Sequence, residues 1–381
     1  MGTTRPAGFA ARPAYLFGPI FDFMTLGGAS LIVCAAVAFL FPRGIPGAQQ
    51  AVLITVLMTI INQPHFAHSY QMFYRNYREK AFGAYPATLR WRYISAGLVV
   101  PTILIAFLAG GILAGSGRVL AYSANAMFFL VGWHYVKQGY GILIVDSVQK
   151  RLMFSDRGKL ILRANGYASW MVAWLAVNHA FSSRNYYIGL AYFSLPIPTW
   201  IYHLSIVGLV LTSAAALVVL LQRWREARGQ LPWNGLVAYL TTLYLWVIFV
   251  RFNPLVLAVV PTFHSLQYLA VVWRYQLNAA ERGEAAPAPA MMSRFLPAHW
   301  SSFVFFIGIG VLLGYLGFQG IPQSIDALVP YDKHLLGPSL FVFSFYIFIN
   351  IHHYFLDNVM WRRGNPDVQQ FIFAKAPRAA R

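Results

Sequence analysis

Histidines lie inside several of the most apolar stretches of this 381-residue chain. Residues 350–357 place His352, His353 and Asp357 within an apolar run that is long enough to cross a bilayer. Burying polar side chains in hydrocarbon is costly, so ionisable residues in such runs usually have a function and a partner. Four further histidines occupy other apolar runs: His65, His68, His134 and His264. Imidazole is a good ligand for iron, copper and zinc, so these residues could together bind a metal.

The composition is that of a polytopic membrane protein. Hydrophobic residues make up 58% of the chain and charged residues only 10%, and the mean hydropathy is +0.55. These values are far from those of a soluble domain. The single cysteine, Cys34, excludes an intrachain disulfide, a thiolate metal cage and a Cys-ligated iron–sulfur cluster. Any cofactor must therefore be held by nitrogen and oxygen ligands.

The apolar segments predict an all-α transmembrane bundle of about ten helices, forming one domain over residues 1–381. A helix needs about 20 apolar residues to cross the hydrocarbon core. The candidate segments are 17–41, 48–73, 93–115, 121–147, 163–181, 200–222, 233–251, 254–274, 299–318 and 336–361. The low-complexity segment 279–293 predicts a flexible cytoplasmic linker between the eighth and ninth helices.

The placement of Lys and Arg predicts the orientation, because cytoplasmic loops accumulate these residues. With the N-terminus inside, most of the 29 basic residues fall on the cytoplasmic side, and Lys137 falls within a helix. The basic residues left outside are Arg43, Arg118, Arg184, Arg251 and Lys333. Both termini are thus expected in the cytoplasm. The net charge of +18 then reflects topology and attraction to anionic lipid headgroups, not nucleic-acid binding. We interpret the first apolar run as a helix that is kept in the mature protein and not as a cleaved signal segment. This interpretation favours a bacterial inner membrane.

Helical spacing places the polar residues of four helices on one stripe each. These helices all run from outside to inside, so the stripes predict one site in the cytoplasmic half of the membrane. The expected metal ligands are His65, His68, His134, His264, His352 and His353. The amides expected to orient these imidazoles around the cofactor are Asn62, Gln138, Gln267 and Asn350. The competing interpretation is that each histidine only forms hydrogen bonds between helices.

Lys137 and Asp357 are the candidate catalytic residues of this site. A cation in the middle of a helix could pair with Asp357 or with Asp22, could bind an anionic headgroup or substrate, or could extend to the interface.

A short motif appears twice in the chain. His68-Ser69-Tyr70-Gln71 follows Pro64, and His264-Ser265-Leu266-Gln267 follows Pro261. A His-Tyr pair comes two helices after each motif. Coincidence and internal duplication explain this pattern equally well. A duplication would bring matching histidines to a shared centre.

The spacings His65-x-x-His68 and His352-His353 resemble the histidine boxes of integral-membrane non-haem iron enzymes. That broad class comprises hydroxylases, desaturases and, more loosely, the bacterial carotenoid-cleaving oxygenases of the Brp/Blh type. The resemblance implies an iron-dependent oxygenase, mono- or dinuclear, that acts on an apolar lipid or isoprenoid and draws on an electron donor. Copper is an alternative metal. Two other functions stay open: an electron-transfer protein with b-type haem and quinone, and a proton-coupled transporter.

Overall fold

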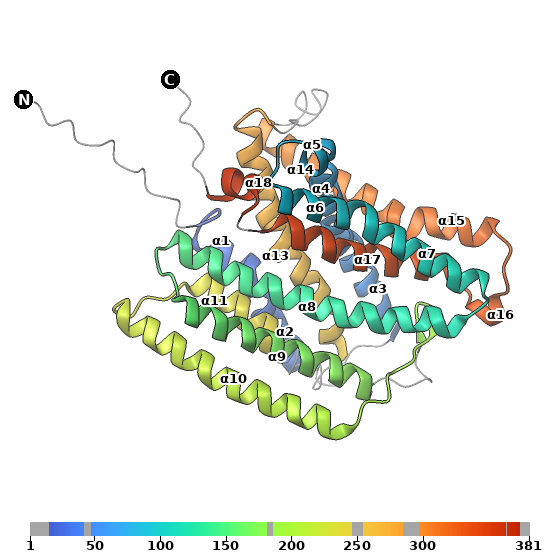
Figure 1. Ribbon diagram of the computed structural model, residues 1–381, viewed down its shortest axis with the longest axis horizontal. Coiled ribbons are helices and arrows are strands. Elements are labelled where there is room, and N and C mark those ends of the chain that lie inside the picture. Colours follow the sequence, from blue (N-terminus) through green and yellow to red (C-terminus); the bar gives the residue numbers. More distant parts are fainter. Residues whose placement is uncertain are drawn as a thin grey trace, which may run out of the picture.

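A computed structural model describes residues 15–41, 47–180, 186–245, 254–284, 297–362 and 364–373. These residues are almost entirely helical, which confirms the predicted all-α class. Within them the strands are limited to a hairpin of β1 (Tyr186–Tyr187) and β2 (Leu190–Ala191). Figure 1 shows the helices as one packed bundle, with α8, α9 and α10 side by side along one edge.

Several of the long helices are built from an α-helical part and a wider π-helical turn, labelled η. The helical elements in chain order are α1 (Pro19–Phe23), η1 (Met24–Gly28), α2 (Ala29–Leu40), α3 (Gly47–Leu57), η2 (Met58–Asn62), α4 (Gln63–Tyr74), α5 (Tyr77–Phe82), α6 (Ala87–Ile94), η3 (Ser95–Val99), α7 (Val100–Leu113), α8 (Gly117–Gln149), α9 (Asp156–Ala180), α10 (Thr199–Glu226), α11 (Trp233–Leu240), η4 (Thr241–Leu245), α13 (Pro254–Ala280), α14 (Ala298–Tyr315), η6 (Leu316–Gly320), α15 (Ile321–Leu328), α16 (Lys333–Leu336), α17 (Leu340–Met360), α18 (Pro366–Val368) and η7 (Gln369–Phe373).

Six helical segments of the described chain are long and apolar enough to cross a membrane. They are Pro19–Val37, Ala87–Leu113, Gly117–Gln149, Thr199–Glu226, Trp300–Leu328 and Lys333–Met360. Helices also lie over the described parts of the other predicted segments, of which residues 181 and 246–251 are outside the described chain. Ten crossings, and the cytoplasmic position of both termini, stay predictions. The proposed linker at 279–293 falls mostly outside the described residues.

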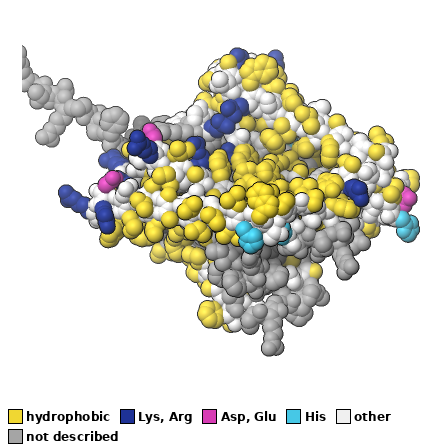
Figure 2. All heavy atoms as spheres, turned by 60° about the horizontal axis from the view of Figure 1, so that its bottom comes forward, with side chains coloured by type: hydrophobic (Ala, Val, Ile, Leu, Met, Phe, Trp, Pro, Cys, Tyr) yellow, Lys and Arg dark blue, Asp and Glu magenta, His cyan; other side chains and the backbone are white. Residues whose placement is uncertain are grey.

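The outer surface suits lipid better than water. On α10 the side chains of Leu204, Val210 and Leu211 are 61%, 61% and 66% exposed. Figure 2 shows hydrophobic side chains over most of the described part of this face, with Lys and Arg gathered mainly toward one end. Contiguous apolar surface of this extent is typical of a membrane-facing region.

Three of the π-helical turns occur immediately before a proline. Pro64 follows η2, Pro101 follows η3 and Pro322 follows η6, each two residues after the turn ends. Proline lacks the N–H that a helix needs, and its ring clashes with a carbonyl of the preceding turn. A wide turn at that point moves the carbonyl away and bends the helix. The positions of these prolines thus coincide with the wide turns of the helices.

Pro101, just after η3, leaves a carbonyl of that turn without its helical donor. A side chain from another helix compensates for the missing N–H. The N–H of Val100 bonds to the carbonyl of Ser95, so the next carbonyl, that of Ala96, would need a donor at Pro101. His352 of α17 fills this role, with its Nε2 2.8 Å from the Ala96 oxygen. Its Nδ1 then accepts the hydroxyl hydrogen of Tyr70, at 2.8 Å. His352 therefore holds α17 against η3 and α4.

Replacing His352 with Phe should destabilise the bundle by about 1–3 kcal/mol, because a buried carbonyl and a buried hydroxyl lose their partners. Restoring an N–H by Pro101→Ala should recover part of this loss. Unfolding in mixed detergent micelles measures both effects. The gain from Pro101→Ala should be larger with His352→Phe than in the wild type. Equal gains in the two backgrounds would refute the proposed compensation.

Candidate metal centre

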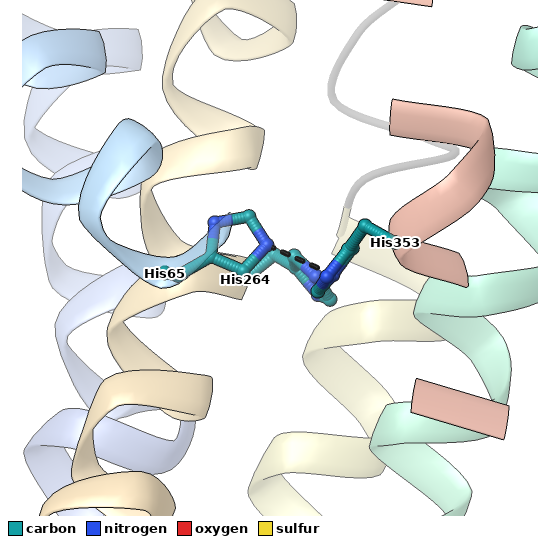
Figure 3. A group of neighbouring side chains, drawn as sticks. All are labelled: His65, His264 and His353. Atoms are coloured by element: carbon teal, nitrogen blue, oxygen red, sulfur yellow. Dashed lines mark hydrogen bonds between the residues drawn. The ribbon is translucent and has the colours of Figure 1, made fainter. Parts of the chain in front are cut away.

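Four histidines from four helices meet in the interior of the bundle. His65 lies on α4, His134 on α8, His264 on α13 and His353 on α17, and all four are buried. The Nε2 atoms of His65 and His353 are 3.2 Å apart, and those of His134 and His264 are 3.1 Å apart. In Figure 3 the rings of His65, His264 and His353 point toward one another from three separate helices. Helices that are far apart in the sequence thus bring their imidazoles to one point.

Asp357 adds a carboxylate to this group. Its Oδ2 is 3.5 Å from the Nε2 of His353 and 3.8 Å from that of His134. Its Oδ1 points away and accepts hydrogen bonds from the Ser69 hydroxyl at 2.9 Å and the Tyr268 hydroxyl at 3.1 Å. These two donors fix the carboxylate so that one oxygen faces the histidines.

The donor atoms form two groups that share His353, and each group is spaced as the ligands of a metal ion would be. The ligating atoms of His65, His264 and His353 lie within 4.8 Å of one another, and so do those of His134, His353 and Asp357. Two nitrogens bound to one ion at about 2.0–2.1 Å in tetrahedral geometry are about 3.3 Å apart. The observed separations of 3.1 and 3.2 Å are close to this value. The residues present therefore fit a metal held by nitrogen and oxygen.

The hydrogen-bond partners of His65 determine which of its nitrogens faces the centre with a lone pair. Its Nδ1 is 2.5 Å from the backbone carbonyl of Asn62, which can only accept a hydrogen bond. The Nδ1 therefore carries the proton and the Nε2 is free to bind a metal. Ser265 lies 2.8 Å from the same Nδ1 and 2.7 Å from the Asn62 side-chain oxygen. Partners of this kind orient metal-binding histidines and raise their basicity.

Aromatic rings hold two of the imidazoles in place. The ring of Tyr135 stacks on His264 with centroids 4.0 Å apart, and Tyr354 stacks on His134 at 4.8 Å. The Tyr354 hydroxyl donates to the Asn350 side-chain oxygen at 3.1 Å. Asn350 thus holds the Tyr354 ring that stacks on His134.

The two predicted glutamines lie on the other side of the cluster. The amide nitrogen of Gln138 donates to the backbone carbonyl of His264 and to the Gln267 side-chain oxygen, both at 3.0 Å. The amide nitrogen of Gln267 donates to the carbonyl of Leu26 at 2.5 Å. These contacts fix α13 against α8 and η1.

The structure does not bring His68 and His352 into the cluster. The Nε2 of His68 donates to the carbonyl of Phe306 at 3.0 Å, and its ring stacks on the Phe306 ring at 3.9 Å. His352 bonds to Ala96 and Tyr70. The repeated motif aligns His68 with His264, yet His65 is the residue of α4 that lies beside His264. The motif therefore does not match the two ligand positions.

A cavity of about 720 Å³ leads to this centre, with His134, Lys137 and Asp357 among its lining residues. It extends to the end of the bundle that holds residues 144–149, 159, 163, 361, 362 and 368–373, the predicted cytoplasmic end. Lys137 donates to the side chain of Asn358 and lies over the Trp133 ring, 4.4 Å from its centroid. Asp22 accepts the backbone N–H groups of Leu16 and Phe17, just before α1, so it is not the partner of Lys137.

Tyr268 is a site residue that the sequence analysis missed, and Ser69 and Ser265 were not proposed as site residues. A simple helical signal was present. Each clustered histidine is followed four residues later by a polar side chain, and positions i and i+4 share a helix face. These pairs are His65 with Ser69, His134 with Gln138, His264 with Tyr268, and His353 with Asp357.

Replacing any clustered histidine with Ala should remove most of the bound metal, because each contributes one donor atom and leaves a gap in the coordination. The change His68→Gln is the matched control, since His68 is equally buried on α4 but bonds to Phe306. Metal analysis of the purified variants measures the outcome. Metal retained by His65→Ala and lost from His68→Gln would overturn the assignment of ligands.

No protein-family model matches the chain, and comparisons with curated proteins and with solved structures find no match.

Proposed function

We propose that the protein is a membrane metalloenzyme, an iron-dependent oxygenase that acts on a lipid or isoprenoid reaching the centre through the cavity. The observation that carries this proposal is the convergence of four buried imidazoles and one carboxylate at the end of that cavity. Bound iron would supply the redox chemistry, with copper as the alternative. The proposal includes ten membrane crossings in a bacterial inner membrane, with the site near the cytoplasmic side.

The residues of the chain would bind the metal, orient its ligands and enclose the site. The histidines and Asp357 would hold the metal, with Asn62, Ser265, Ser69 and Tyr268 fixing their orientation. Burial of the cluster would keep bulk water away from it. Insertion of one oxygen atom from dioxygen would release the other as water and require two electrons from a donor. Cleavage of a carbon–carbon double bond that places both atoms in the products would require no external donor.

The haem alternative is less compatible with the packing. A porphyrin needs a flat slot between its axial histidines. His134 and His264 instead face each other at 3.1 Å, and their rings already stack on Tyr354 and Tyr135. A transporter would need a relay of ionisable groups across the membrane. Four of the buried histidines of the described chain gather at one point with Asp357, which favours binding of an ion over a relay.

Protein purified gently in detergent should contain iron at a substantial fraction of one or two equivalents, with no Soret band in its visible spectrum. A functional site should stay largely occupied under such conditions. Less than roughly a tenth of an equivalent of iron, copper or zinc would contradict the proposal, again because such a site holds its metal tightly. A Soret band would favour the haem alternative.

Removing the metal with a chelator should lower the Tm of the wild type by on the order of 5 °C, because a ligand bound only to the folded state stabilises it. The variant His353→Ala is the control, since it should start at a lower Tm and respond little to the chelator. Equal responses of both proteins would show that the stabilising metal is bound somewhere else.

A further inference from the structure

Lys137 is a partly buried cation without a carboxylate partner. Its ammonium group is hydrogen-bonded to the Asn358 amide, and its charge lies against the face of Trp133. Among the described residues, which include every Asp and Glu of the chain, none forms an ion pair with it. The accumulation of basic residues in cytoplasmic loops does not account for this charge either, since Lys137 falls inside a candidate membrane-spanning helix. An unpaired cation in such a place normally has a partner or a function.

The surroundings of Lys137 reinforce its positive charge. Arg163 and Arg362 line the same cavity, and their charges act on the Lys137 ammonium by repulsion. The three acidic residues that line the cavity are already engaged elsewhere. Asp22 accepts backbone N–H groups, and Asp146 pairs with Lys150 at 2.8 Å. Asp357 accepts hydrogen bonds from Ser69 and Tyr268 and faces the histidine cluster. Because these carboxylates already have partners, the cations around the cavity would attract an anion.

Lys137 also lies next to the candidate metal centre. It is three residues after His134 on α8, so the two side chains are neighbours on one helix face, about 5–6 Å apart at Cβ. The cavity continues past them along apolar side chains such as Ile144, Val145 and Val271. The cavity therefore offers a cationic point beside the histidines and an apolar wall along part of the remainder.

From this arrangement we infer that the substrate is an amphiphile with an anionic head group, a carboxylate or a phosphate, which Lys137 binds beside the histidine cluster. The apolar wall of the cavity holds the chain. The carbons nearest to the head group are then the ones presented to the centre. This inference rests on the proposed function for the reaction, while the binding of the amphiphile is independent of it.

The test is displacement of a fluorescent long-chain carboxylate from the protein in nanodiscs of neutral lipid. Dodecanoate and dodecyl phosphate represent the two head groups, dodecanol is the neutral control, and inorganic phosphate represents a free anion. The wild type should bind at least one anionic amphiphile about tenfold more tightly than the alcohol, as expected for a charge-assisted hydrogen bond. Equal binding of the alcohol would overturn the inference. Displacement by inorganic phosphate at the same concentration would also overturn it, since the ligand would then be a free anion.

Variants separate the charge of Lys137 from its packing. Lys137→Met should weaken binding by about tenfold or more through loss of the charged partner, and Lys137→Arg should keep most of it. Asn358→Asp leaves Lys137 in place but gives it an internal counter-ion, so it should weaken binding as Lys137→Met does. Lys333→Met, outside the cavity, is the control and should bind as the wild type. Unchanged affinity in both Lys137→Met and Asn358→Asp would refute the role of Lys137.

The metal content of the same samples distinguishes the two proposals. Binding of the amphiphile by a protein that holds no metal would remove the proposed oxygenase function and leave this inference standing. Metal without any preference for the anionic amphiphile would remove this inference alone.

Discussion

The bundle depends on the meeting of four imidazole nitrogens in a dry interior. Buried polar atoms need partners, and two neutral imidazoles that face each other through Nε2 can share only one proton. The carbonyl of Asn62 holds the proton of His65 on Nδ1, so His65 presents a lone pair to the centre. A cation at the centre is the partner that satisfies several such lone pairs at once. The positions of α4, α8, α13 and α17 are therefore tied to one point.

Other histidines of the same helices fix those positions. His352 and His353 are adjacent, so their side chains point about 100° apart around α17. One faces the cluster, and the other supplies the hydrogen bond that Pro101 removes from η3. On α4, His65 faces the centre while His68 bonds to Phe306 of α14. The same residue type thus serves as a candidate ligand and as a link between helices, and the helix face decides which.

This division explains how far the sequence could predict the site. Apolar runs and helical spacing predicted the helical class and the four stripes, and all four clustered histidines belong to the predicted set. The choice between His65 and His68, and between His352 and His353, depends on how each helix is rotated about its axis. A π-helical turn holds one extra residue and changes that rotation by about 100°. The turn η2 ends at Asn62, three residues before His65, so a regular helix drawn from Gly47 to Tyr74 misplaces the faces of α4 relative to α3.

The charge of the centre links the proposed metal to the proposed substrate. Four neutral imidazoles and one carboxylate around a divalent ion leave one positive charge, and Lys137 adds a second nearby. In a low-dielectric interior, uncompensated charge is costly. Part of the cost is offset locally by Asn358 and Trp133, which contact the Lys137 ammonium but carry no charge. A neutral hydrocarbon would leave this excess unchanged, whereas an anionic head group bound beside Lys137 would reduce it. Electrostatics therefore favour an anionic amphiphile over a neutral isoprenoid as the molecule that enters the cavity.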